Sequence, residues 1–351
     1  MSSDAGPLNK RPCCFTPLLA AAALACAQPA PTAVKLEGRT MGTSYHITLA
    51  ETMPPDRQGR LKSDIDILLA AINKKMSTYD PESELSRFNR SISRQPFSVS
   101  PETLDVVRTA RRIAEETRGA FDPTIGPLVD LWGFGPAARS KELPGDTAIA
   151  AARSHTGYRR LKTWDTPPAL GKDISSLRVD LSAIAKGYGV DAVARLIKAR
   201  GHQNFMVEIG GEVFAQGKNP RGRPWRIGID TPHDGAPPGG QFSAFVSLHN
   251  AALATSGGYR NFYTRDGRRY AHFIDPRTGR PVEHGLASVS ITAPTCMEAD
   301  AAATAVMVLG AERGRGFIEE HPGWEALFIS ADEKGGFTVT STPGFPRASG
   351  G

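Results

Sequence analysis

Long hydrophobic runs are absent from this sequence of 351 residues. The apolar stretch Phe15–Ala25 covers 11 residues, whereas a membrane-spanning helix needs roughly 20. Cysteine is also scarce, because only Cys296 follows residue 27. One cysteine cannot form an internal disulfide, and no CxxC or zinc-ligand spacing occurs. The stability of the folded chain must therefore come from an ordinary hydrophobic core.

Several common nucleotide and hydrolase motifs are missing as well. Gly211 and Gly217 precede Lys218 with five intervening residues, whereas a P-loop requires four. A GxGxxA pattern over 133–138 is interrupted by Pro136 and follows no predicted strand, which excludes a Rossmann fingerprint. There is no HExxH and no GxSxG.

The charge is close to balanced, with 42 Lys and Arg against 36 Asp and Glu and a net charge of +6. Hydrophobic residues make up 40% and charged residues 22%, as in an ordinary globular protein. The basic residues are scattered, without a dense arm or an RNP-like aromatic pattern, so we expect no nucleic-acid partner.

Residues 1–27 read as a secretory signal, because Lys10 and Arg11 precede the apolar stretch and small residues follow it. Two processing routes remain open. The chain can be cleaved before Gln28, or Cys26 can become the lipidated first residue, although Leu24 lies one position from its usual place in a lipobox. Either route predicts an exported protein. Lipidation at Cys26 would attach it to a membrane.

The rest of the chain divides into a Pro-rich linker over 28–35, one domain over 36–330 and a Gly- and Ser-rich tail over 331–351 to which we assign no role. Alternating and helical periodicities indicate the elements of the domain. Strands are predicted at 44–49, 205–209, 225–229, 244–248 and 286–292, and helices at 60–75, 101–119, 188–199 and 299–309. A Gly- and Pro-rich loop covers 119–145. Strands mixed with long helices, without a strict βαβ rhythm, predict an α+β fold.

Asp300 and Thr304 are four residues apart and would share one helix face, flanked by alanines. A carboxylate and a hydroxyl suit Mg²⁺, which prefers oxygen donors. The alternative is a capping Asp and a Thr bonded to the preceding turn.

Asp180 and Lys186 lie where a strand ends and a helix begins, as in a loop that approaches phosphate. Alternatively, Asp180 only caps that helix.

His272 lies just before the turn 275–279 and is the best-placed general base among the histidines, unless it is purely structural. Tyr79 and Phe121 stand in polar loops that could stack on a planar ring. Core packing is the alternative for both.

Eight strings resemble the FAD:protein FMN transferase (ApbE-like) family, in the order of that family. They are MGTSYHIT (41–48), MSTYDPESELSRFN (76–89), GAFDPTIGPLVDLWGF (119–134), VDLSAIAKGYGVD (179–191), VEIGGEVFAQG (207–217), ATSGGYRNF (254–262), HFIDPRTGRPV (272–282) and MEADAAATAVMVLG (297–310).

The resemblance implies a tunnelling-fold-related mixed sheet with a helical insertion. It also implies an enzyme that cleaves FAD, attaches FMN to a Thr or Ser of an acceptor protein and releases AMP. Such proteins are commonly exported and lipid-anchored, which implies a bacterial periplasmic location at the inner membrane. The implied FAD contacts are Met41, Tyr79, Ala120, Phe121, Asp122, Asp180, Lys186 and Ile274. Mg²⁺ would be held by the Ala183 carbonyl, Asp300 and Thr304, and His272 would be the base.

Two other functions use the same ligand. An FAD pyrophosphatase would release free FMN and AMP, with water in place of the acceptor hydroxyl. A non-catalytic flavin-binding protein would need neither the metal ligands nor a base.

Overall fold

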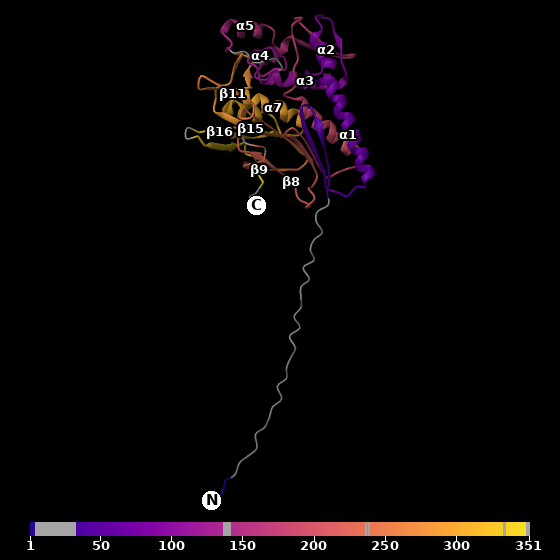
Figure 1. The fold of residues 1–351 in the computed structure, drawn as a ribbon, viewed down its shortest axis with the longest axis vertical. Coiled ribbons are helices and arrows are strands. Elements are labelled where there is room, and N and C mark those ends of the chain that lie inside the picture. Colours follow the sequence, from indigo (N-terminus) through magenta and orange to yellow (C-terminus); the bar gives the residue numbers. More distant parts are fainter. Residues whose placement is uncertain (4–32, 136–141, 236, 238, 333–334, 349–351) are drawn as a thin grey trace. The chain divides into compact units, whose positions relative to one another are not determined.

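The structure is a computed structural model, shown as a ribbon in Figure 1. It describes residues 1–3, 33–135, 142–235, 237, 239–332 and 335–348. Most of the predicted signal segment and linker, including Cys26, lies outside the described residues. Among the described residues, no helix has both the length and the apolar character needed to cross a membrane. The described chain from residue 33 onward belongs to one compact unit.

An eight-stranded antiparallel sheet is the centre of the fold, with strand order β1-β2-β6-β7-β10-β15-β16-β17. Its strands are β1 (Val34–Thr40), β2 (Thr43–Leu49), β6 (Phe205–Ile209), β7 (Glu212–Gln216), β10 (Ala251–Gly257), β15 (Leu286–Ala293), β16 (Glu325–Ala331) and β17 (Phe337–Ser341). The predicted mixed α+β fold is confirmed.

Smaller sheets and the helices complete the described part of the chain. The remaining strands form the pairs β8 (Trp225–Asp230) with β9 (Phe242–Leu248), β11 (Phe262–Arg265) with β12 (Arg268–Ala271), β13 (Ile274–Asp275) with β14 (Arg280–Pro281), and the sheet β3 (Phe97–Ser98), β5 (Pro168–Lys172), β4 (Leu161–Asp165). The helices are α1 (Pro55–Met76), α2 (Glu84–Arg90), α3 (Pro101–Glu116), α4 (Gly126–Leu131), α5 (Asp146–Ser154), α6 (Ala185–Ala199), α7 (Cys296–Leu309) and α8 (Ala311–Glu319), with a 3-10 turn at Tyr158–Arg160.

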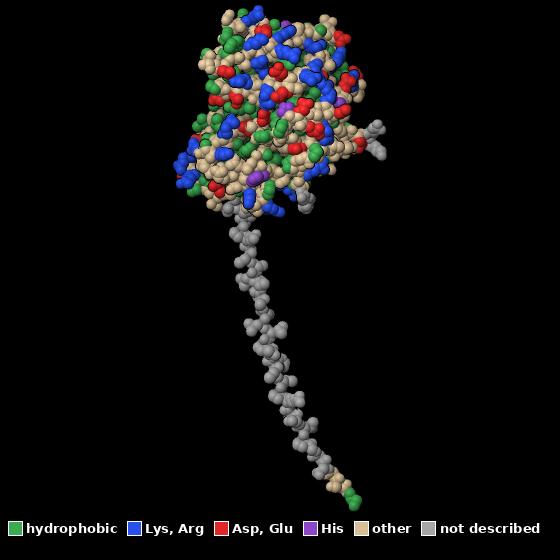
Figure 2. Space-filling model, turned by 180° about the vertical axis from the view of Figure 1, so that it is seen from behind, with side chains coloured by type: hydrophobic (Ala, Val, Ile, Leu, Met, Phe, Trp, Pro, Cys, Tyr) green, Lys and Arg blue, Asp and Glu red, His purple; other side chains and the backbone are tan. Residues whose placement is uncertain are grey.

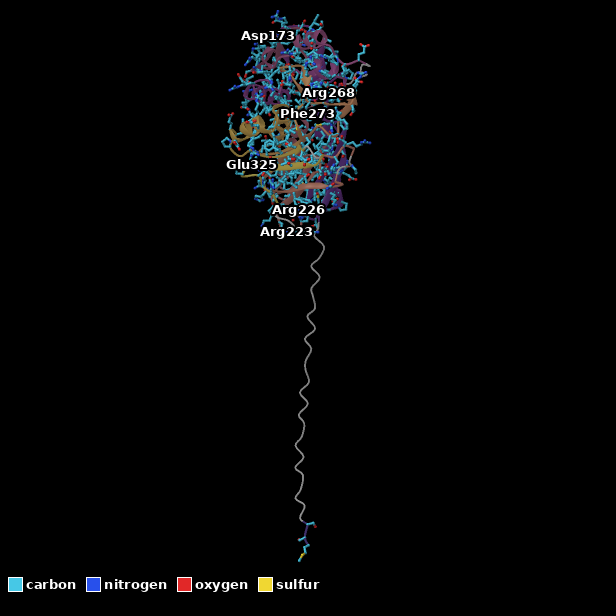
Figure 3. The ribbon with its side chains drawn as sticks, turned by 90° about the vertical axis from the view of Figure 1, so that its left-hand side faces the viewer. Asp173, Arg223, Arg226, Arg268, Phe273 and Glu325 are labelled. Carbon is cyan, nitrogen blue, oxygen red and sulfur yellow. The ribbon has the colours of Figure 1, made fainter. Side chains whose placement is uncertain are left out.

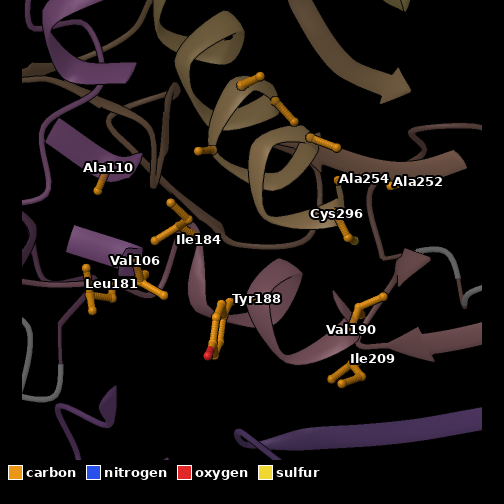
Figure 4. Packing of buried hydrophobic residues seen from close by; sticks show 14 of the residues in the cluster. Val106, Ala110, Leu181, Ile184, Tyr188, Val190, Ile209, Ala252, Ala254 and Cys296 are labelled. Atoms are coloured by element: carbon orange, nitrogen blue, oxygen red, sulfur yellow. The ribbon is translucent and has the colours of Figure 1, made fainter. Parts of the chain in front are cut away.

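The main sheet is covered on both faces because its side chains alternate. On β10, Ala252 and Ala254 join the large core formed with α1, α6 and α7, whereas Leu253 joins a second core under the β8–β9 hairpin. Figure 4 shows Ala252 and Ala254 near Cys296 at the start of α7. In Figure 1, α7 lies along the sheet, and α2–α5 gather at the end of the body away from β8 and β9.

Helix starts follow the capping signals in the sequence. Ser100 caps α3 and Pro101 occupies its first turn, as predicted. Two sets of hydrogen bonds stabilise the start of α7. Thr295 accepts a hydrogen bond from the Glu298 N–H, and the Asp191 carboxylate, from α6, accepts the N–H groups of Cys296 and Met297 at 2.8 and 2.9 Å. Asp191 therefore ties the two helices together.

A small core attaches the helical insertion to the strands near residue 274. Leu128 and Trp132 from the insertion pack with Tyr270 and Ile274. The Trp132 ring stacks on Tyr270 with centroids 5.8 Å apart, and its Nε1–H donates to the Gly279 carbonyl at 2.8 Å. The loop around the insertion thereby gains a fixed position against β12 and β13.

Three segments predicted as loop, linker or tail contain regular structure instead. The stretch predicted as a loop over 119–145 contains α4, which begins at Gly126 with Pro127 in its first turn. Val34, in the predicted linker, starts the edge strand β1. The predicted tail contributes β17, and Ala348 donates its N–H to Phe245 on β9, so the ordered domain extends beyond residue 330.

Lys and Arg side chains alternate with Asp and Glu over the face of the body shown in Figure 2. Ion pairs between residues distant in sequence include Arg178 with Asp130 at 2.7 Å and Arg200 with Asp64 at 2.6 Å. Exposed pairs of this kind contribute little stability individually.

Candidate active site

A cavity of about 580 Å³ opens where the helical insertion meets the main sheet. Its walls come from the loop after α3, the loop before α6, the ends of β7 and β10, the strand β13 and the helix α7. Nearly all of the predicted site residues line it, namely Tyr79, Ala120, Phe121, Asp122, Asp180, Ala183, Lys186, His272, Ile274, Asp300 and Thr304. Phe273, another lining residue, is labelled near the middle of the body in Figure 3.

Met41 does not line this cavity. It has a positive φ of 49° in the turn between β1 and β2, and its side chain packs against the large core. A Cβ placed on Gly189 of α6 would lie 2.9 Å from the Met41 Cε. Met41 therefore contacts α6 at Gly189 and is not among the residues that line the cavity.

Asp300 and Thr304 both present their side chains to the cavity from α7. The Asp300 Oδ2 atom accepts the Gly187 N–H at 3.0 Å, which leaves Oδ1 on the side of Lys186. Asp300 does not cap α7, because Thr295 occupies that position. Asp300 therefore does not cap its own helix; it accepts an N–H from the first turn of α6 and lines the cavity.

Three charges meet at this wall. The Lys186 Nζ atom lies 3.2 Å from Glu212 Oε1 and 3.7 Å from Asp300 Oδ1. The two carboxylic side chains are only 6% and 4% exposed, against 28% for Lys186. Burial acts to lower the pKa of Lys186, but the Asp300 and Glu212 carboxylates raise it above its usual value. Burial raises the pKa of Glu212 above its usual value, and the neighbouring Lys186 ammonium opposes that rise by favouring the carboxylate.

The Asp122 carboxylate organises its own loop. Its Oδ1 accepts the Thr124 N–H and hydroxyl at 2.8 and 2.6 Å, and its Oδ2 accepts the Tyr158 N–H at 3.0 Å. Burial raises the pKa of Asp122 despite these donors. Asp122 therefore shapes the cavity wall by fixing the backbone, and both of its oxygens already have partners.

The Asp180 loop is held from two sides. Asp180 donates its N–H to the Pro123 carbonyl at 2.7 Å, and its Oδ1 accepts the Ser182 N–H at 2.8 Å. One residue earlier, Val179 exchanges two hydrogen bonds with the Asn89 amide at 2.7 and 2.8 Å. Because α6 begins at Ala185, Asp180 forms a local turn and does not cap that helix, which contradicts the capping alternative.

His272 presents a defined tautomer. Its Nδ1 lies 3.1 Å from the Asn261 carbonyl oxygen, which can only accept, so Nδ1 carries the proton and Nε2 is the free acceptor. The ring packs on Phe273 with centroids 4.1 Å apart. Burial lowers the pKa of His272 below its ordinary value. A neutral imidazole at the cavity is suited to accept a proton near neutral pH.

The two aromatic residues expected at a planar ligand differ. Tyr79 is 76% exposed and stands at the cavity wall, whereas Phe121 is buried in the large core and reaches the cavity from there. Tyr79 is free to stack on a ligand. Phe121 takes part in core packing, as the alternative for that residue proposed.

Glu212 was not identified from the sequence as a site residue. A usable signal was present, because Glu212 follows the Gly210-Gly211 turn and opens a strand whose other residues are apolar or buried. Asn89 was also overlooked, since its contact with Val179 joins residues 90 positions apart.

The donor set fits Mg²⁺. Among the described residues, no group of three His, Cys, Asp or Glu side chains could hold a metal ion, but Mg²⁺ needs only one or two carboxylates beside waters and substrate phosphates. The buried Asp300 carboxylate, the Thr304 hydroxyl and the Ala183 carbonyl would supply oxygen from one cavity.

A sequence model of the ApbE family matches residues 41–328. The FAD:protein FMN transferase of Vibrio cholerae is 44% identical over 308 residues, which is 88% of this chain and 90% of that protein. The FAD:protein FMN transferase of Salmonella typhimurium is 39% identical over 317 residues, covering 90% and 89% of the two chains.

Solved structures give the same result. The flavin transferase ApbE from Vibrio cholerae superposes with a TM-score of 0.80 at 43% identity, covering 90% of this chain and 98% of that one. The apo flavinyl transferase ApbE from Pseudomonas stutzeri gives a TM-score of 0.78 at 36% identity, covering 89% and 95%.

Proposed function

Because the chain belongs to the ApbE family and is an FAD:protein FMN transferase, we propose that it works with Mg²⁺ in the cavity around Asp300. There it would transfer FMN from FAD to a Thr or Ser hydroxyl of an acceptor protein and release AMP. One observation carries this proposal. Asp300, Thr304, Lys186 and His272 converge on a single cavity whose volume of about 580 Å³ is in the usual range for ligand sites.

The reaction replaces the phosphoanhydride bond of FAD with a phosphoester bond to the acceptor. The acceptor hydroxyl oxygen forms a bond to the FMN phosphorus while the pyrophosphate bond to AMP breaks, and the hydroxyl proton must be removed. We assign that proton to His272 Nε2, because Nδ1 already donates to Asn261. A positioned base of this kind typically contributes about 10²–10⁴-fold to the rate.

Two features of the wall would stabilise the anionic pyrophosphate. The Lys186 ammonium faces the cavity and would contact phosphate oxygens. Asp300, Thr304 and the Ala183 carbonyl would hold Mg²⁺, which when bound neutralises charge on the transferring phosphate. The exposed Tyr79 and the loop fixed by Asp122 would orient the flavin.

We also propose that the protein is exported and attached to a membrane through lipidated Cys26, with a periplasmic location. The basic and apolar pattern of residues 1–27 supports export. Lipidation would be tested by comparing the mass and the membrane association of the wild-type protein with those of Cys26→Ser.

The catalytic proposal is tested by following AMP release from FAD with and without an acceptor protein, in Mg²⁺ and after EDTA. We expect AMP release to require both Mg²⁺ and the acceptor. Release that continues in EDTA would contradict the metal assignment, and equal release without an acceptor would identify a hydrolase instead.

A further inference from the structure

Glu212 is a buried carboxylate in the cavity wall for which the proposed chemistry has no role so far. It is the first residue of β7, directly after the Gly210-Gly211 turn. Its side chain is 6% exposed. Oε1 pairs with Lys186, whereas Oε2 is buried without a hydrogen-bond partner among the described residues. Burying a carboxylate with one unsatisfied oxygen costs free energy of folding. The presence of Glu212 in this wall therefore suggests a functional role.

In the ion pairs of the described residues, Glu212 and Asp300 share a single cation, the Lys186 ammonium. Its Nζ lies closer to Glu212 Oε1, at 3.2 Å, than to Asp300 Oδ1, at 3.7 Å. The second distance exceeds that of a hydrogen bond. The ammonium is therefore bonded to Glu212 and stands beside Asp300 without being bonded to it.

This arrangement matters because a lysine and a divalent cation would seek the same oxygen. If Glu212 lost its charge, the ammonium would be drawn onto Asp300 Oδ1, the oxygen that Gly187 leaves free. Lys186 would then compete with the metal for its carboxylate ligand, and it would also move away from the cavity centre where a phosphate must bind.

We propose that Glu212 is a positioning residue that holds the Lys186 ammonium off Asp300, so that Asp300 is free for the divalent cation and Lys186 for the substrate phosphate. This inference rests on the proposed function, because it assumes a cation at Asp300 and an anionic substrate beside Lys186. It adds to that function the residue Glu212, which would contact neither the cation nor the substrate.

The test is a double-mutant cycle with Glu212→Gln, Lys186→Gln and the double variant. Mn²⁺ binding is measured by electron paramagnetic resonance without FAD, and FAD binding is measured by flavin fluorescence without metal. We expect Glu212→Gln to weaken Mn²⁺ binding about tenfold, the size of losing one charge-assisted contact. The double variant should bind Mn²⁺ as tightly as Lys186→Gln, because no ammonium remains to compete.

The proposal is overturned if Glu212→Gln weakens Mn²⁺ binding by the same factor whether or not Lys186 is present, since Glu212 would then act through its own charge. The FAD affinities of the same variants provide a second test. Glu212→Gln should weaken FAD binding only when Lys186 is present, and an equal loss in the Lys186→Gln background contradicts the role.

Glu208→Gln is the matched control. Glu208 lies before the same Gly-Gly turn, and its carboxylate accepts the Gly211 N–H at 2.6 Å without lining the cavity. Its substitution should leave Mn²⁺ affinity within twofold of wild type. A wild-type protein that binds FAD but no Mn²⁺ would refute the metal part of the proposed function, and the FAD cycle would then decide the role of Glu212 by itself.

Discussion

Helices α6 and α7 touch at Gly187, and we predict that Gly187→Ala disturbs both the fold and the metal site. A Cβ on Gly187 would lie 2.3 Å from the Cys296 carbonyl oxygen, 2.7 Å from its carbon and 2.8 Å from the Met297 Cα. These are backbone atoms at the start of α7 and cannot rotate away. Ordinary contacts need about 3.5 Å, so the two helices must separate by about 1 Å.

The expected cost follows from two opposing effects. Overpacking of this kind costs about 1–3 kcal/mol, whereas replacing a helical glycine with alanine gains about 1 kcal/mol from propensity. We therefore expect the free energy of unfolding to fall by up to about 2 kcal/mol. The same displacement separates the Gly187 N–H from Asp300 Oδ2, so Mn²⁺ affinity should fall as well.

Urea unfolding of Gly187→Ala and Gly59→Ala provides the comparison. Gly59 lies in α1, and a Cβ there meets nothing within 4 Å, so Gly59→Ala should stabilise the protein by about 0.5–1 kcal/mol. If both variants gain stability equally and Gly187→Ala retains wild-type Mn²⁺ affinity, the close contact between the helices does not position Asp300.

Three further predictions concern the cavity. Asp300→Ala should abolish Mg²⁺-dependent FAD turnover, and unchanged turnover would remove Asp300 from the metal site. Burial lowers the pKa of His272 from 6.5, so the neutral base is present at pH 7 and kcat/KM should fall only as the pH drops below about 6.5. His272→Gln should remove this acidic limb of the pH profile and slow transfer by about 10²–10⁴-fold. An acidic limb that persists in the variant would point to another base. Asn89→Ala removes both hydrogen bonds to Val179 and should lower the free energy of unfolding by about 1–3 kcal/mol while raising KM for FAD; a wild-type KM would show that the Asp180 loop holds its position without Asn89.

Local patterns in the sequence predicted much of the fold. The predicted strand over 205–209 coincides with β6, and the helix predicted from Pro101 begins at that residue. These elements carry regular periodicity or capping residues. The short helix α4 carries neither, since it has only six residues and no side-chain cap, and its position depends on the packing of Trp132 against Tyr270.

The predicted site residues other than Met41 line one cavity, but their contacts with one another could not be predicted from their spacing in the sequence. Lys186 and Glu212 lie on different elements, and only the packing of α6 against β7 brings them together. Asp122, which the resemblance places at FAD, uses both carboxylate oxygens to bind Thr124 and Tyr158. Such pairings depend on tertiary structure.

The most direct test of the central claim is the intact mass of an acceptor protein after incubation with the purified enzyme, FAD and Mg²⁺. The account predicts that the acceptor gains the mass of one FMN phosphoester, that an equal amount of AMP appears and that EDTA prevents both. AMP and free FMN without any gain in acceptor mass, across acceptors that carry exposed Thr or Ser hydroxyls, would contradict transfer and identify hydrolysis of FAD as the reaction.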